Sequence, residues 1–422
     1  MPTSRREAWT PPVRPDWVSR VNEEGAGLDL KSVVPLDPSS LIGAATANTG
    51  LNDFGTDDWR EPFAFLMKSF DEEAHLHLMG RIMTRSDVIM FLEARLRVED
   101  AYKRHPEIDY EVIEAPLWVI GQGRTGTTML QTLLSLDPEN RTLIIRDALF
   151  PAHKEGDPNA YFETADHRSR MWNRVTPEVA SIHDFAAHEP IEMIMIESLS
   201  FQQPAWLNLL GLAPGFTGYL AQSGGLANAV VYGKRVLKLL QWQAHREGEP
   251  KKRWALKSPD HIRYIPTLLD AYPDVRLIWA HRDPVKAMAS AVNMIGTLTW
   301  IRSDQKVSEG MFDAITDPVA TAASLSAPID LIESGVIPAA QLFNLQYEEL
   351  ISDPEGTVAA AYAHFGLSLS ARAKELIATH LAAHPRSSRP KHTYSDGDAT
   401  RICDERATFA RYESYFHVPR EI

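Results

Sequence analysis

The chain has 422 residues, of which 44% are hydrophobic and 23% charged, as in an ordinary globular protein. Its length favours one large domain, or a core with an appended layer, over a string of small modules. Against 56 Asp and Glu it has 43 Lys and Arg, and the resulting net charge of -13 disfavours bulk binding of nucleic acid or anionic membrane surfaces.

A single cysteine, Cys403, excludes an intramolecular disulfide and a cysteine-based metal cluster. The N-terminal residues lack the apolar run of a signal peptide, and no apolar stretch is long enough to span a bilayer. We therefore expect a cytoplasmic protein without an integral membrane segment.

The first quarter of the chain has two parts with different sequence patterns. Residues 1 to about 40 are rich in Pro, Ser and charge without periodicity, which predicts a loosely ordered arm. From 57 to about 105, apolar residues such as Phe63 and Leu66 recur at helical spacing, which predicts a layer of about three helices. We expect residues 1–109 to form this arm and helical layer.

The remainder, residues 110–422, has the pattern of an α/β core. A short apolar run bounded by glycine ends the stretch 110–120 and is typical of a strand buried on both faces, and strand-like runs recur at 275–280 and 342–347. Alternation with helices predicts a P-loop-type parallel sheet flanked by helices, with ligands at the carboxyl ends of its strands. A helical insertion at 150–250 is expected over those strand ends, where it would form an acceptor pocket.

The leading motif is the loop Gly121–Thr128, which directly follows the first predicted strand and directly precedes a helix. Glycines allow a tight turn in which backbone N–H groups and the helix N-terminus point at one anion, as in a phosphate-binding loop. Thr127 stands where an ATP-binding loop of this spacing has its lysine. Arg124 supplies a cation instead, and its fork of donors can bind two oxygens of a phosphate or sulfate.

A second motif follows the strand at 275–280, where Asp283 and Pro284 are typical of a helix start. Arg282 would leave the strand end, and Ser290 would lie about two turns along the helix, so the two side chains can share one phosphate. An ordinary surface arginine is the structural alternative.

Two further residues stand at the ends of apolar stretches. Lys257 precedes a helix start at Ser258-Pro259, and Tyr347 follows the third predicted strand, where its ring can pack on a purine. Each also fits a structural role, the lysine beside a helix cap and the tyrosine in the core.

Together these motifs resemble the PAPS-dependent sulfotransferase family, in particular the bacterial branch that is similar to protein-tyrosine sulfotransferases and whose loop reads GxxRTGTT. The resemblance covers most of the chain. It rests on the following segments in order: Thr49–Gly55, the loop at 121–128, Leu256–His261, Arg282-Asp283-Pro284 with Ser290, Tyr347–Leu350 with Asp353–Gly356, and Lys391–Ser395.

The resemblance implies PAPS as the sulfuryl donor and PAP as the product. It implies that Arg282 and Ser290 hold the 3′-phosphate, that Tyr347 lies near adenine, and that Lys391 adds a further cation. Lys257 would neutralise charge on the bridging oxygen as the S–O bond breaks. The 5′-phosphosulfate would be held by Gly123, Arg124, Thr125, Gly126, Thr127 and Thr128.

The general base has two candidates. Family members often have Trp-Glu where this chain has Arg146-Asp147, and Asp147 is one methylene shorter than that glutamate. His183, with Asp184 beside it, lies in the expected acceptor insertion. A surface or helix-cap role is the alternative for both.

The function predicted from these motifs is transfer of a sulfuryl group from PAPS to a hydroxyl of a small-molecule or lipid acceptor. We expect no metal, since His75 and His77 would face away from each other on a helix. One alternative is a P-loop kinase that uses ATP and magnesium. Another is a pseudo-sulfotransferase that binds the nucleotide without turnover, suggested by Arg146-Asp147.

Overall fold

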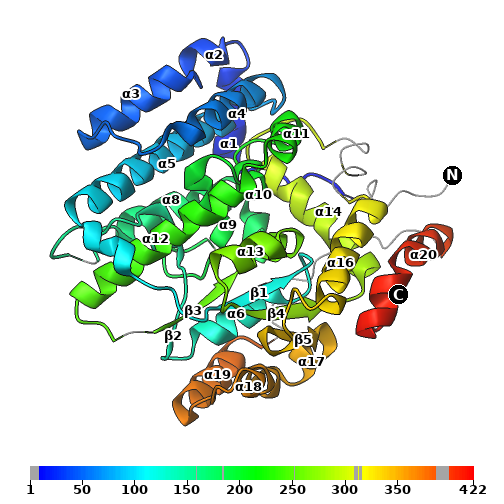
Figure 1. Ribbon diagram of the computed structural model, residues 1–422. Helices are drawn as coiled ribbons and strands as arrows, with labels where there is room; N and C mark the ends of the chain where they lie inside the picture. The colour runs from blue at the N-terminus through cyan, green and yellow to red at the C-terminus, as the bar shows by residue number, and fades with distance from the viewer. Residues whose placement is uncertain are drawn as a thin grey trace.

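The computed structural model describes residues 9–157, 159–182, 185–250, 252–307, 312, 316–385 and 399–422. Within these residues a parallel sheet of five strands has the order β2-β3-β1-β4-β5. The strands are β1 (Leu117–Gly121), β2 (Asn140–Arg141), β3 (Arg253–Lys257), β4 (Arg276–His281) and β5 (Leu342–Gln346). The predicted α/β fold, a parallel sheet flanked by helices, is confirmed (Figure 1).

Two of the five strands were not predicted from the sequence. The apolar stretch before Lys257 has only three residues in β3, and β2 has only two residues, so both are too short to be identified as strands from their pattern. Both are held by their neighbours, since Leu117 of β1 aligns with Ala255 of β3 and Arg141 of β2 aligns with Trp254.

Alternate residues of the central strands enter two different hydrophobic clusters, as the strand period of two requires. Val119 and Ile278 pack toward the smaller cluster, while Trp118 and Leu277 pack toward the larger one. The helices that flank the sheet in sequence are α6 (Thr127–Ser135), α13 (Ile265–Ala271), α14 (Pro284–Trp300), α16 (Pro318–Glu333), α17 (Tyr347–Ser352), α18 (Pro354–His364), α19 (Ala371–Ala383) and α20 (Ala399–Phe416).

The N-terminal part of the chain forms a helical layer at the far side of the molecule from α18 and α19 (Figure 1). Its helices are α1 (Asp16–Gly25), α2 (Leu30–Val33), α3 (Pro38–Thr49), α4 (Arg60–Glu72) and α5 (Leu78–Arg104), with a short 3-10 turn, η1 (Asp57–Trp59). The prediction of a loosely ordered arm over residues 1 to about 40 is wrong for α1 and α2. The helices α1 to α3 are short and bury few side chains, among them Val18 and Leu41, so none contains the long apolar repeat that marks α5.

The predicted three helices between 57 and 105 are two long helices, because α5 runs unbroken over 27 residues. His75 and His77 precede α5 and do not lie on a helix. His77 is the N-cap of α5, and its Nδ1 accepts a hydrogen bond of 2.8 Å from the N–H of Gly80. The division of the chain at residue 109 stays a prediction.

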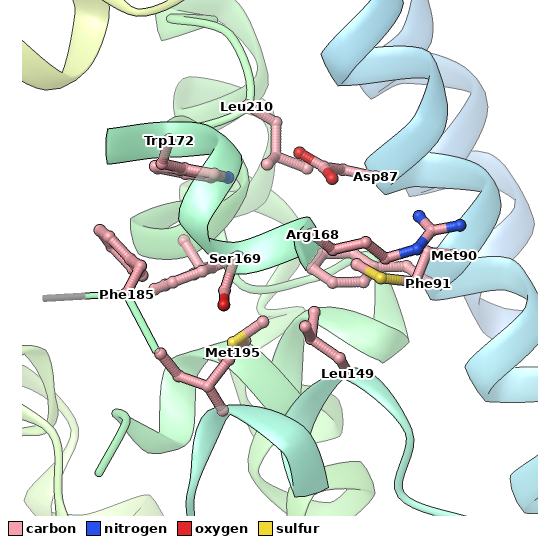
Figure 2. Close-up of a pocket in the computed structure, with 12 residues that line it drawn as sticks. Asp87, Met90, Phe91, Leu149, Arg168, Ser169, Trp172, Phe185, Met195 and Leu210 are labelled. Carbon is pink, nitrogen blue, oxygen red and sulfur yellow. The ribbon is translucent and has the colours of Figure 1, made fainter. Parts of the chain in front are cut away.

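Between β2 and β3 lie the helices of the predicted insertion. They are α8 (Phe162–Val175), α9 (Met193–Glu197), α10 (Pro204–Leu207), α11 (Pro214–Ser223) and α12 (Leu226–Arg246), and α7 (Ile145–Leu149) directly precedes the predicted range of 150–250. The 3-10 helices η2 (Pro106–Tyr110), η3 (Pro177–Ser181), η4 (Ser198–Ser200), η5 (Pro259–Arg263) and η6 (Ala339–Gln341) complete the described elements. Between α5, α8 and α9, the N-terminal layer and the insertion leave a pocket (Figure 2).

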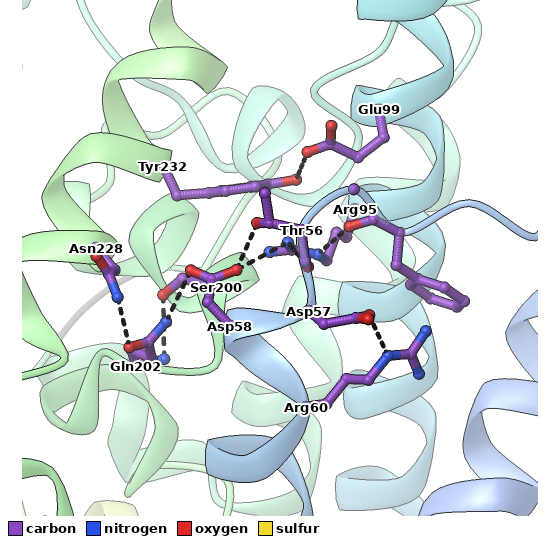
Figure 3. A network of polar contacts seen from close by, with 12 residues as sticks. Thr56, Asp57, Asp58, Arg60, Arg95, Glu99, Ser200, Gln202, Asn228 and Tyr232 are labelled. Atoms are coloured by element: carbon purple, nitrogen blue, oxygen red, sulfur yellow. Dashed lines mark hydrogen bonds and ion pairs between the residues drawn. The ribbon is translucent and has the colours of Figure 1, made fainter. Parts of the chain in front are cut away.

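A buried arginine joins the N-terminal layer to the insertion (Figure 3). Arg95 of α5 donates to the carbonyls of Phe54 (2.8 Å), Leu199 (3.1 Å) and Thr56 (3.3 Å). Its guanidinium also lies 4.4 Å from the ring centroid of Tyr232 on α12. One side chain therefore satisfies carbonyls from two segments that are far apart in sequence.

Replacing Arg95 by methionine is expected to destabilise the protein by about 3 kcal/mol, because buried carbonyls lose their donor. Urea denaturation of the variant and the parent measures the change. The matched control is Arg97→Met on the same helix, whose ion pair with Glu93 is partly exposed and is expected to contribute less than about 1 kcal/mol. Equal losses in the two variants would contradict this role for Arg95.

Candidate functional site

The loop after β1 turns tightly, and two of its glycines are required by that turn. Gly121 has φ of 145° and Gly126 has φ of 86°, both in the region that favours glycine. A Cβ on Gly121 would lie 2.7 Å from the carbonyl oxygen of Ala280, and one on Gly126 would lie 3.0 Å from the ring of Tyr347. The backbone between them leads directly into α6, whose first two residues are Thr127 and Thr128. The N–H groups and dipole at such a helix N-terminus favour an anion.

Arg124 adopts the left-handed conformation, with φ of 73°, which is costly for a residue with a Cβ. Its Nε donates to Oγ of Ser290 on α14 at 2.9 Å. Within the same loop the hydroxyl of Thr125 donates to the carbonyl of Gln122 at 2.8 Å. The structure thus joins Arg124, which was assigned to the 5′-phosphosulfate, to the serine that was assigned to the 3′-phosphate.

Arg282 leaves the end of β4 next to this loop. Its Nη1 donates to the carbonyl of Arg124 at 2.8 Å, and its guanidinium lies 4.0 Å from the ring centroid of Tyr347. Asp283 caps α14 by accepting from the N–H of Val285 at 3.0 Å. Four of the predicted nucleotide-binding side chains, those of Arg124, Arg282, Ser290 and Tyr347, therefore meet at neighbouring strand ends.

Lys257 ends β3 and is almost completely buried, with 2% of its side chain exposed. Its Nζ lies 3.1 Å from Oγ1 of Thr128 in the loop and 2.7 Å from Oε1 of Glu192. Glu192 was not singled out from the sequence. Its only local signal is a carboxylate directly before the apolar helix α9, which does not reveal a partner on a distant strand.

The segment that carries Glu192 is fixed by backbone contacts. The N–H of Ile191 donates to the carbonyl of Leu143 at 2.8 Å, and the amide of Gln131 on α6 donates to the carbonyl of Ile191 at 2.9 Å. Glu192 is the residue before the first turn of α9, and its side chain makes no cap hydrogen bond there. Its carboxylate is therefore available to Lys257.

A buried ion pair ties α9 to η5, the turn that follows Lys257. Nε2 of His261 lies 3.0 Å from Oε2 of Glu197, and neither side chain is exposed. Burial by itself would lower the pKa of His261, but the carboxylates of Glu197, Asp260 and Glu192 together outweigh it and raise that pKa. The amide of Gln203 donates to the same Glu197 oxygen at 2.9 Å. The pair holds the helix of Glu192 against the strand end of Lys257.

Asp147, a predicted base, lies on α7 in a buried cluster of cations. Its Oδ1 is 3.1 Å from Nε of Arg146 and 3.3 Å from Nε2 of His153, and its Oδ2 is 3.9 Å from Nη2 of Arg141. Burial alone would raise the pKa of Asp147, but the hydrogen bond with His153 and the two arginines outweigh it and lower that pKa. Such a carboxylate holds its charge as part of the cluster and accepts a proton poorly.

Other predicted residues are placed less fully. His183, the second candidate for the base, and Lys391 lie outside the described residues. Gly123 is in the loop, and a Cβ at that position would meet nothing within 4 Å, so its side of the loop is open.

The pocket between the N-terminal layer and the insertion is partly open, and its empty space, together with adjoining solvent, amounts to about 380 Å³. Figure 2 shows Leu149 and Met195 pointing into it from below, with α5 and α8 as its walls. Met195 lies on the helix that Glu192 precedes, and α7 is joined to the Glu192 segment by a hydrogen bond of 3.0 Å from the N–H of Ile145 to the carbonyl of Glu189. A largely apolar pocket thus adjoins the segment that carries Glu192.

The described residues contain neither a metal-binding cluster nor a membrane-spanning helix. No group of three or more His, Cys, Asp or Glu side chains is arranged to hold a metal ion in this part of the chain. No described helix has both the length and the apolar character needed to cross a membrane.

The chain is similar to mycobacterial proteins along much of its length. It is 26% identical over 267 residues to omega-hydroxy-beta-dihydromenaquinone-9 sulfotransferase Stf3 of Mycobacterium tuberculosis and of Mycobacterium bovis. The match spans 61% of this chain and 64% of each relative, which is slightly less than two thirds of the relative's length.

Solved structures extend the similarity to the whole fold. Sulfotransferase STF1 from Mycobacterium tuberculosis is 26% identical, with a TM-score of 0.68, over 90% of this chain and 98% of that one. Sulfotransferase STF9 from Mycobacterium avium is 25% identical, with a TM-score of 0.75, over 91% and 97%. Residues 116–371, more than half of the chain, match the model of the family described as the sulfotransferase family. The chain therefore belongs to the sulfotransferase family.

Proposed function

We propose that the protein transfers a sulfuryl group from PAPS to a hydroxyl of a small-molecule or lipid acceptor. The observation that carries this proposal is the position of Lys257, whose Nζ lies between Thr128 of the phosphate loop and the carboxylate of Glu192. A cation and a carboxylate are thereby placed together at one end of an anion-binding loop. Sulfuryl transfer requires both, one for the leaving oxygen and one for the acceptor proton.

The residues present fit the nucleotide, because the site's donors are cations, hydroxyls and a helix N-terminus. The loop at 123–128 would hold the 5′-phosphosulfate. Arg282 and Ser290 would hold the 3′-phosphate, and Tyr347, which packs against both the loop and Arg282, would lie near adenine. Because Arg124 reaches Ser290, its side chain can contribute to either phosphate group.

We assign the role of general base to Glu192 in preference to Asp147. The Glu192 carboxylate would take the proton of the acceptor O–H as the acceptor oxygen attacks sulfur and the bond from sulfur to the bridging oxygen breaks. Protonation of Glu192 removes the charge that neutralises Lys257. The lysine charge would then be fully available to the leaving phosphate of PAP. Transfer of the proton to Glu192 and departure of PAP would therefore assist each other.

The acceptor side is consistent with a hydroxyl on an apolar body. The pocket of Figure 2 is lined mostly by apolar side chains, and it adjoins the segment that carries Glu192. The relative Stf3 is named for a menaquinone derivative, a lipid-like acceptor. Both observations support an acceptor whose hydroxyl enters beside Glu192 and whose apolar part packs between the helical layers.

The kinase alternative is disfavoured by the loop itself, because Thr127 replaces the lysine that such loops use on the β- and γ-phosphates. A dependence of turnover on added magnesium would favour that alternative. The pseudo-sulfotransferase alternative rested on Arg146-Asp147. A different carboxylate, Glu192, now stands beside the lysine, so that departure from the family pattern no longer argues against turnover.

Replacing Lys257 by methionine is expected to lower kcat by about 10²- to 10³-fold, by analogy with the loss of one preorganised donor to a developing charge. PAP affinity should change little, because charge builds on the bridging oxygen only as the bond breaks. PAP release is measured with PAPS and the best acceptor from a panel of phenols and long-chain alcohols, and PAP affinity by calorimetry.

Lys238→Met, which removes a lysine from α12 outside the site, serves as the control and should retain parental turnover. A Lys257→Met protein with normal kcat, or with its whole defect in nucleotide affinity, would contradict the role proposed for this lysine.

The variant Glu192→Gln is expected to lose about 10²- to 10⁴-fold in kcat, since an amide cannot accept the acceptor's proton. A base must be deprotonated to act, so parental activity should fall on the acid side of the pH profile. That fall should flatten in Glu192→Gln and persist in Asp147→Asn and His183→Asn. If Asp147→Asn alone flattened the acid side, Asp147 would be the base and this assignment would be wrong.

A further inference from the structure

The arginine proposed for the 3′-phosphate already binds an anion supplied by the chain itself. Nε of Arg282 lies 2.6 Å from Oε1 of Glu421, and its Nη2 lies 2.8 Å from Oε2. The pair is largely enclosed, with 12% of the Arg282 side chain and 21% of the Glu421 side chain exposed. This two-pronged geometry is the one an arginine offers to a carboxylate or to a phosphate.

The geometry leaves little room for both anions on the same donors. Glu421 takes the Nε and Nη2 edge of the guanidinium, while Nη1 donates to the carbonyl of Arg124 in the phosphate loop. A phosphate on the Nε and Nη2 edge would have to replace the carboxylate. If the carboxylate and the phosphate both remained, they would also repel each other, because like charges close together are unfavourable.

Several contacts anchor the residues around Glu421, so its carboxylate is held near Arg282. The N–H of Glu421 donates to Oδ2 of Asp283 at 2.8 Å, and Nε of Arg420 donates to Oε2 of Glu413 on α20 at 3.0 Å. Arg406 of α20 joins the same acids, at 2.7 Å from Asp283 and 2.8 Å from Glu413. A tethered carboxylate competes at high effective concentration.

From these contacts we infer that Glu421 is a reversible latch on the 3′-phosphate subsite, which PAPS must displace to bind. The inference rests on the proposed function, because it takes Arg282 as the 3′-phosphate ligand. A latch closed about 90% of the time weakens the apparent affinity for the nucleotide about tenfold. A nucleotide without a 3′-phosphate leaves the pair intact and gains nothing when the latch is removed.

Calorimetry with PAP and with adenosine 5′-monophosphate tests the latch in the full chain. Glu421→Gln keeps the side-chain size and removes the charge. It should bind PAP about tenfold more tightly than the parent and bind adenosine 5′-monophosphate within about twofold of it. Glu348→Gln removes an exposed carboxylate next to Tyr347 and controls for general charge, so its PAP affinity should stay within about twofold of the parent.

The same Glu421→Gln change, made in an Arg282→Ala protein, distinguishes the latch from indirect effects of the substitution. With Arg282 replaced by alanine there is no guanidinium to contest, so adding Glu421→Gln should give no further gain in PAP affinity. Parental or weaker PAP binding by Glu421→Gln would overturn the latch alone. Failure of the parent and of all variants to bind PAP would overturn both the latch and the proposed function.

Discussion

The site depends on a single electrostatic constraint, which is that a parallel sheet gathers cations at one edge. The carboxyl ends of β1, β3 and β4 are neighbours, where Lys257 ends β3 and Arg124 and Arg282 follow β1 and β4. Like charges so close together are costly unless anions neutralise them. Within the described residues, Glu192 pairs with Lys257 and Glu421 pairs with Arg282. Phosphates of the nucleotide would take over the same task.

The two carboxylates differ in what they would do once the nucleotide binds. Glu192 is fixed by the backbone of the insertion and would remain beside Lys257, where it can accept the acceptor's proton. Glu421 occupies donors that the 3′-phosphate needs and would have to leave. The buried pair of Glu197 and His261 keeps the first arrangement rigid, since it clamps α9 to the turn that follows Lys257. The acid proposed as the base thus pairs with a lysine that contacts Thr128, and the acid proposed as the latch pairs with an arginine that contacts the carbonyl of Arg124.

A feature of this site could be predicted from the sequence when the residues that form it are close together in the chain. The loop Gly121–Thr128 and the cap of α14 are local features, dictated by glycine geometry and by Asp283, so they were recognisable without the structure. The partners of Lys257 and Arg282 were not, because Glu192 and Glu421 reach them from distant elements and carry no local signal. The strand β3 was missed for a similar reason, since its short run is stabilised by neighbouring strands rather than by its own pattern.

The most direct test of this account is a crystal structure of the complex with PAP, grown in the presence of EDTA. Density for the 5′-phosphate within the loop at 123–128, and for the 3′-phosphate between Arg282 and Ser290, is the predicted result. Glu421 should then be displaced from Arg282. Nucleotide bound elsewhere on the chain, or a 3′-phosphate that avoids Arg282 while Glu421 keeps its place, would contradict the assignment of these strand ends as the nucleotide site.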